Sequence, residues 1–207
     1  MHISSIKLFN TNKGSTPILV AHAEDLSKFP FLMRINGSAK EMLLFFSREF
    51  VSNTPRGEFK GCRENDYIGW IHHNSKGLAG VIICDKEYER RVAFSLLQKS
   101  MTMYENTQSN WDWPTYDKDI ELNTINPEFK SLIIKYQNPE EHDSILKVMK
   151  GLQDTKVILY ESIDKMLERG EKIDVLVDKS KDLSHQSKQF YIKSKKLNSW
   201  CDSCCIS

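Results

Sequence analysis

Long apolar runs are absent from this chain of 207 residues. The longest stretch without a charged or strongly polar residue near its centre is Gly77 to Cys84, whereas a membrane-spanning helix needs about 18 to 20 apolar residues. A signal-peptide core is also lacking, because Lys7 interrupts the apolar residues of the N-terminus, and His2 stands where N-myristoylation requires glycine. We therefore expect a cytosolic protein without a transmembrane helix.

An excess of charge of one sign is lacking as well. The chain has 29 basic and 28 acidic side chains, for a net charge of +1, so composition gives no general case for binding nucleic acid. Hydrophobic residues make up 40% and charged residues 28%, which is a globular balance. The length fits one domain, or one domain with an extension.

Catalytic motifs are missing too. The segment Asn12 to Thr16 has the wrong order for a P-loop, and we find no G-x-G-x-x-G, G-x-S-x-G or H-E-x-x-H. His72 and His73 are adjacent on a predicted strand and point to opposite faces, so they do not chelate together. We expect no enzyme, no metal and no cofactor, although an acyl transfer promoted by the N-terminal region is an enzymatic alternative without a nucleophile and base to recommend it.

The first 137 residues switch between an apolar period of two and one of 3.6, which indicates an α+β domain. Alternation and turn residues predict strands at 3–9, 17–22, 59–64, 67–72 and 78–84 in an antiparallel sheet. Helices are predicted at 39–51, at 89–106 and from Pro127 onward. Ser38 and Glu41 have the spacing of a capping box at the start of the first helix.

The first predicted helix has more apolar residues than one face needs. Met42, Phe45 and Phe46 belong to a set that covers much of its circumference. Either the helix is sandwiched in the core, or its outer face receives another segment of this chain or a lipid. The sequence leaves both alternatives open.

After Asn138-Pro139 the pattern becomes that of a coiled coil. No proline follows, and apolar or hydroxyl side chains recur in steps of three and four over more than seven heptads. A continuous helix with this pattern would be about 80 Å long. The seam consists of Ile145, Val148, Leu152, Thr155, Leu159, Ser162, Met166, Arg169, Ile173, Leu176, Ser180, Leu183, Ser187, Phe190, Ser194 and Leu197.

The composition of the seam predicts other proteins as partners. Its Ser and Thr residues would leave a self-paired coil short of apolar contact, so a stable homodimer is not expected. Arg169 lies in the middle of the seam, where a guanidinium costs several kcal/mol unless acceptors surround it. Neutral amide oxygens, as in glutamine, would satisfy its donors and fix the register. A surface arginine that merely coincides with the seam is the alternative.

The C-terminal residues fit a lipid anchor. Cys204-Cys205-Ile206-Ser207 has the form of a C-a-a-X box, and serine at X indicates a farnesyl group on Cys204. One prenyl chain gives only reversible membrane binding, so Cys201 is a candidate for a second, palmitoyl group, and the lysine-rich stretch before it suits an anionic membrane. A metal site of Cys201, Cys204, Cys205 and His185 is a competing interpretation that lacks a second ligand pair.

These features resemble a known family. Residues 166–173, with 154–156 upstream and 186–191 downstream, look like the R-SNARE motif of synaptobrevin-type proteins, and specifically of the lipid-anchored longin SNAREs of the Ykt type. The likeness extends through 78–82, 91–97, Asp112-Trp113-Pro114 and 136–139, and so covers nearly the whole chain. One departure is that this family usually ends in C-C-a-a-X, whereas here the box moves the prenyl group to Cys204 and the second acyl site to Cys201.

The resemblance implies a profilin-like longin domain at 1–137, with a five-stranded antiparallel sheet between one helix and two, an R-SNARE coiled-coil helix at 138–200 and a lipidated tail at 201–207. It implies that Arg169 is the zero-layer arginine facing three glutamines of Q-SNARE helices. It also implies fusion along endoplasmic reticulum, Golgi, endosomal, vacuolar and autophagic routes, with cycling between cytosol and membranes. The longin domain would fold back on the SNARE segment and shelter the lipid, through a surface that includes Met42, Phe45 and Phe46. A lipid-anchored tether or adaptor is the alternative function.

Overall fold

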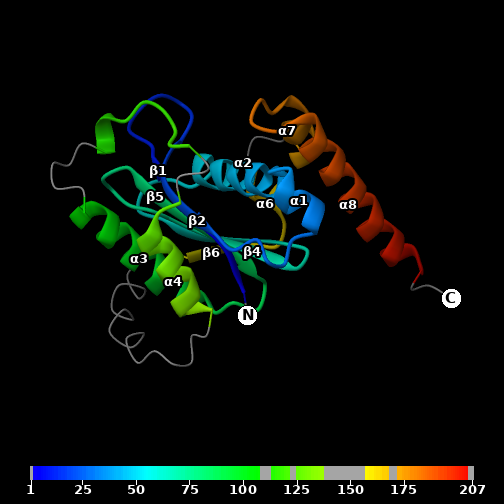
Figure 1. Ribbon diagram of the computed structural model, residues 1–207, viewed down its shortest axis with the longest axis horizontal. Helices are drawn as coiled ribbons and strands as arrows, with labels where there is room; N and C mark the ends of the chain where they lie inside the picture. The colour runs from blue at the N-terminus through cyan, green and yellow to red at the C-terminus, as the bar shows by residue number, and fades with distance from the viewer. Residues whose placement is uncertain (1, 108–112, 122–124, 138–156, 168–171, 205–207) are drawn as a thin grey trace.

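The computed structural model describes residues 2–107, 113–121, 125–137, 157–167 and 172–204. A twisted sheet runs through the middle of the molecule, and helices cover both of its faces (Figure 1). Its first five strands are β1 (Ile3–Asn10), β2 (Ile18–Glu24), β3 (Phe59–Glu64), β4 (Tyr67–His73) and β5 (Leu78–Asp85), and they pair antiparallel in the order β2-β1-β5-β4-β3. All five strands agree with the sequence prediction to within about two residues.

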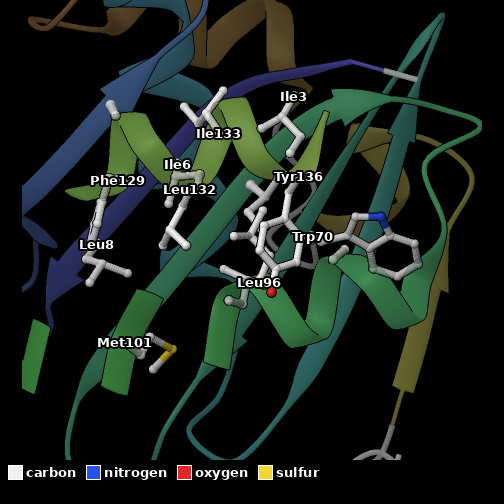
Figure 2. Close-up of a cluster of buried hydrophobic side chains, with 14 of the residues drawn as sticks. Ile3, Ile6, Leu8, Trp70, Leu96, Met101, Phe129, Leu132, Ile133 and Tyr136 are labelled. Carbon is white, nitrogen blue, oxygen red and sulfur yellow. The ribbon is translucent and has the colours of Figure 1, made fainter. Parts of the chain in front are cut away.

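Helices α3 (Arg90–Thr107) and α4 (Pro127–Tyr136) cover one face of the sheet. Proline at the first helical position and the Asn126 side chain, which accepts from two backbone N–H groups, explain why α4 begins where it does. Figure 2 shows the apolar core beneath these helices, where Phe129, Leu132 and Tyr136 of α4 meet Ile6 and Leu8 of β1.

Helices α1 (Phe31–Ile35) and α2 (Ser38–Ser52) lie on the opposite face. The short α1 was not predicted. The capping-box prediction was wrong: α2 has Gly37 at its N-cap with φ +79°, and the side chain of Asn36, not that of Ser38, accepts a hydrogen bond from the backbone N–H at the helix start. Glu41 is engaged elsewhere, as described below.

A buried ionic cluster joins β1 and β2. The carboxylate of Glu24 accepts hydrogen bonds from Lys7 and His22, and all three side chains are nearly inaccessible to solvent. Burial alone would raise the pKa of Glu24, but the hydrogen bond from His22 and the charge of Lys7 lower it to about 2. The cluster therefore favours the ionised carboxylate strongly.

The structure differs from the prediction after residue 137, in the last third of the chain. The described part of 138–200 is not one continuous helix in this conformation but forms β6 (Val157–Tyr160), α6 (Ile163–Met166), α7 (Ile173–Lys179) and α8 (His185–Cys204). Strand β6 pairs in parallel with β3, so the sheet has a sixth strand instead of the five expected. A lone helix with a hydroxyl-rich seam is marginally stable in water, whereas folding back buries its apolar residues against α2.

None of the helices in the described ranges is long and apolar enough to cross a membrane.

Candidate functional site

The candidate site is the face on which the fold-back segment, residues 157–167 and 172–204, packs against the N-terminal domain. The first four positions of the predicted seam lie outside the described residues, namely Ile145, Val148, Leu152 and Thr155. Arg169 lies outside them as well. The side chains of Ser194, Leu197, Cys201 and Cys204 are likewise outside the description, although α8 continues to Cys204. The remaining seam residues can be placed.

Most of the described seam residues face the N-terminal domain. Met166, Ile173 and Leu183 are at most 5% exposed, and Ser187 is fully buried. Leu176 and Phe190 are partly buried and pack against the same apolar cluster, which includes Phe45 and Val51 of α2. These six seam residues therefore share one surface here, although the segment is not one helix.

Three seam residues do not take part in this burial. Leu159 lies in β6 with 40% of its surface exposed. Ser162 is the N-cap of α6 and accepts from the N–H of Lys165 at 3.3 Å. Ser180 accepts from the N–H of Asp182 at 3.1 Å in the turn between α7 and α8. The two serines explain the breaks in the helix, because a serine side chain can take the place of a backbone partner there.

Arg48 of α2 fastens the fold-back segment by charge. Its side chain is 8% exposed, and its guanidinium donates to Asp182 of the fold-back segment, to Asp119 of the N-terminal domain and to the carbonyl of Pro17. Burial alone would lower the pKa of Arg48, but the hydrogen bonds to the two carboxylates outweigh it and raise that pKa. The buried guanidinium of Arg48 thus joins the fold-back segment to the N-terminal domain.

Glu41 of α2 holds the start of α8. Its carboxylate accepts from the backbone N–H of Ser184 at 2.9 Å and from the hydroxyl of Ser187 at 2.7 Å. Partial burial would raise the pKa of Glu41, but these hydrogen bonds lower it below its ordinary value. An acidic group at a helix N-terminus is also favoured by the helix dipole. Glu41 therefore works as an N-terminal partner for a helix far away in the sequence.

Asp174 ties α7 to α8. It accepts from the hydroxyl of Tyr191 at 2.9 Å and from Lys195 at 2.6 Å. The hydrogen bond from Lys195 is the main reason that the pKa of Asp174 is lowered. The two helices form a hairpin, and α8 contacts α2.

An apolar pocket of about 310 Å³ lies between the fold-back segment and the N-terminal domain. Its volume is at the lower end of the range of about 300 to 1,000 Å³ found for ligand pockets. Met42 and Phe46, two of the three residues predicted for this surface, line the pocket. The third, Phe45, is buried and does not line the pocket, and its ring centroid lies 5.4 Å from that of Phe46. Further apolar lining comes from Phe29, Met33, Leu43, Phe50, Ile83, Ile163, Phe190 and Tyr191.

Several of these residues were not found from the sequence. Arg48 could have been noticed as a cation within an apolar helix, and Glu41 was noticed but assigned to the wrong partner. Phe29 and Met33 gave no signal, because they precede the helix whose apolar excess was recognised. Both earlier alternatives for that helix hold in part, since α2 is sandwiched between the sheet and another segment of the same chain.

Groups of three or more His, Cys, Asp or Glu that could hold a metal are not found among the residues the structure describes. Within that same part of the chain, Cys62 and Cys84 are free, and burial raises the pKa of both thiols, that of Cys62 to about 12. His73 donates from Nδ1 to the carbonyl of Thr54, and its Nε2 lies 2.8 Å from the hydroxyl oxygen of Thr11, so this side chain has a structural role.

Comparison with known proteins identifies the family. The model of the regulated-SNARE-like (longin) domain matches residues 26–133, about half of the chain, and the synaptobrevin model matches residues 144–203. The fold and these two matches define a SNARE protein with an N-terminal longin domain.

Whole-length relatives narrow this class. The chain is similar to the protein described as "Synaptobrevin homolog YKT6" of Eremothecium gossypii, with 37% identity over 97% of this chain and 98% of the relative. It is 36% identical to the protein of the same description from Saccharomyces cerevisiae, over 97% of this chain and 98% of that relative. It is 40% identical to the protein from Debaryomyces hansenii, over 91% of this chain and 92% of that relative. The chain belongs to the Ykt-type longin R-SNAREs.

Membership in this family settles several expectations. The predicted longin fold class is confirmed, and so is a role in vesicle trafficking as an R-SNARE. The family is not enzymatic and uses no cofactor, which confirms those two predictions.

Proposed function

We propose that this R-SNARE fuses vesicles with target membranes by zippering with three Q-SNARE helices. The proposal divides the chain into a longin domain at 1–137, a SNARE motif at 138–200 and a lipidated tail at 201–207. Zippering would run from Ile145 toward Leu197, with Arg169 donating to glutamines in the central layer. Burial of the seam supplies the free energy, and the anchored end transmits it to the membrane.

We further propose that the conformation described above is an autoinhibited state. The observation that carries this proposal is the burial of Met166, Ile173, Leu183 and Ser187 against the longin domain, because these are seam positions that Q-SNARE helices would need. One surface cannot be buried in two places, so folding back and zippering exclude each other. The closed state sets the fraction of protein available for fusion.

The lipid assignment is part of the same proposal. Cys204 carries a farnesyl group, Cys201 a reversible palmitoyl group, and the pocket beside Met42 and Phe46 shelters the prenyl chain when the protein leaves the membrane. A helix from Tyr191 to Cys204 spans about 20 Å, so the prenyl chain reaches the pocket only if the end of α8 turns back. In such a cycle the protein alternates between cytosol and the cytosolic faces of Golgi, vesicle and endosomal or vacuolar membranes.

Fractionation of the lipidated protein tests this cycle. We expect Phe46→Asp, which puts a charge into the pocket, to reduce the cytosolic fraction of the farnesylated protein several-fold. Ile134→Asp is the matched control, because Ile134 is 69% exposed on α4, on the other face of the sheet. An unchanged cytosolic fraction for Phe46→Asp would contradict the proposal that the pocket shelters the prenyl chain, but it would leave the R-SNARE proposal intact.

The trafficking routes are inferred from the family resemblance. We propose action in endoplasmic reticulum–Golgi, intra-Golgi, endosomal or vacuolar and autophagic transport. Identification of the Q-SNAREs captured with the protein tests each route, because each set of Q-SNAREs belongs to particular membranes. Capture without any Q-SNARE would favour the lipid-anchored tether.

A further inference from the structure

Helix α1 presents a cluster of large apolar side chains to solvent. Phe31, Leu32 and Ile35 are 65%, 69% and 63% exposed, and they occupy one short helix of five residues. The other strongly exposed large apolar residues in the described ranges are spread singly over four elements, at Ile134, Leu159, Val175 and Ile192. Single exposed apolar residues are normal at protein surfaces, but a contiguous group of them indicates a binding surface.

The cluster is held rigidly in its outward position. Met33, in the middle of the same helix, is 4% exposed and lines the apolar pocket, so it fixes α1 to the body of the domain. After the helix, the side chain of Asn36 accepts from the N–H of Ser38 and fixes the turn into α2. The exposed residues are therefore not a loose segment that could fold inward.

The charges along the segment that contains α1 favour an anionic surface. The sequence has no acidic residue from Leu26 to Lys40, whereas it has three basic ones, Lys28, Arg34 and Lys40. Lys28 forms an ion pair with Asp85 at 2.7 Å. The guanidinium of Arg34 lies over the ring of Phe31, 5.7 Å from its centroid, so this cation accompanies the apolar group directly.

The position of α1 is also suited to a membrane. Its residue Met33 lines the same pocket as Phe190 and Tyr191 of α8, and α8 runs out beside α1 toward the C-terminus (Figure 1). The exposed side chains project from the surface, which fits insertion between lipid headgroups better than packing into a groove of a partner. Large apolar side chains with an adjacent arginine are typical of interfacial elements.

We propose that Phe31, Leu32 and Ile35 form a membrane-contact element that inserts into the headgroup region of an anionic bilayer, with Arg34 at the phosphate level. The contact orients the longin domain on the membrane. This proposal depends on the proposed lipid anchor in one respect only, because the anchor determines which side of the protein faces the bilayer.

The test uses the full chain produced without lipid groups, sedimented with vesicles of phosphatidylcholine alone or with phosphatidylserine. We expect binding that requires phosphatidylserine and that falls at least about tenfold in a Phe31→Ser/Leu32→Ser/Ile35→Ser variant. Ile134→Ser, an equally exposed apolar residue on α4, should bind as the unmodified chain does.

Two further measurements keep the test decisive. Thermal unfolding should show the same midpoint for the triple variant and the unmodified chain, and Arg34→Ser with Leu32→Asn replaces the triple variant if that variant unfolds. Equal vesicle binding by variant and unmodified chain, or no binding by either, overturns the proposal. Loss of a concentration-dependent dimer in the variant, without an effect on vesicles, assigns the cluster to a second copy and overturns it too. Because no Q-SNARE or prenyl group is present, a negative result leaves the proposed fusion function unaffected.

Discussion

The ion pair between Arg48 and Asp182 gives a quantitative prediction for the closed state. Asp182→Asn keeps the shape of the side chain and removes its charge, and it leaves the contacts of Arg48 with Asp119 and Pro17 in place. A hydrogen bond between charged groups contributes about 1.5 to 3 kcal/mol, but the Asp182 side chain is 39% exposed, which reduces the value to about 1 kcal/mol. The open state should therefore become about fivefold more populated.

Amide hydrogen exchange measures this shift. In the variant, amides of β6 and α7 should exchange about fivefold faster under conditions where exchange follows opening, while those of β1 and β5 keep their protection. Asp178→Asn is the matched control, because Asp178 is an exposed acidic residue four positions earlier in the same segment. It should leave exchange unchanged.

A double-mutant cycle identifies the partner. Arg48→Met combined with Asp182→Asn should accelerate exchange by less than the product of the single effects, because both changes remove the same interaction. Multiplicative effects, or equal acceleration by Asp178→Asn, would refute the assignment of this ion pair as a closing contact.

Three further predictions concern other parts of the chain. Leu183→Ala should favour opening by about 2 to 4 kcal/mol, since it leaves a cavity against α2, and exchange of α8 amides should increase while the thermal midpoint of the longin core changes little. Glu24 has a folded pKa of about 2, below its ordinary 4.5, so it should contribute on the order of 3 kcal/mol to the free energy of unfolding above pH 4.5, and this contribution should be lost as the pH falls toward 2. Urea titrations of Glu24→Gln should show a lower stability at pH 7 and a weaker loss of stability between pH 4.5 and 2. An unchanged loss of stability over this range would contradict the lowered pKa. Cys204→Ser should release the protein from membranes, and a variant that stays fully membrane-bound would exclude prenylation at Cys204.

The fold of the first 137 residues was predictable because its signals are local. Strand alternation, Asn126-Pro127 before α4 and the turn at Asn74–Gly77 each act over a few residues and agree with the final topology. Gly77, for example, has φ +84° in that turn, a backbone conformation that glycine adopts without strain. Such requirements are visible without knowledge of distant contacts.

The conformation of the last third of the chain was not predictable in the same way. A seam of threes and fours describes which face is apolar, and it fits both a coiled coil and a segment folded onto α2. The choice depends on long-range contacts such as that of Glu41 with Ser184 and that of Arg48 with Asp182, whose sequence separation exceeds one hundred residues. Glu41 shows the difficulty directly, because its spacing from Ser38 suggested a local cap while its partners lie in α8.

Capture of the protein from detergent-solubilised membranes, with SNARE disassembly blocked, tests the central claim most directly. Leu176→Asp should remove three stoichiometric Q-SNARE partners, whereas Val175→Asp, at an exposed neighbouring position outside the seam, should retain them. Leu176 is also packed in the closed state, so a charge there opens the protein and would increase capture if the seam were not the binding surface. Loss of all three Q-SNAREs with Leu176→Asp alone is the predicted result; partners that survive this change, or that lack glutamine at the layer of Arg169, would contradict the account.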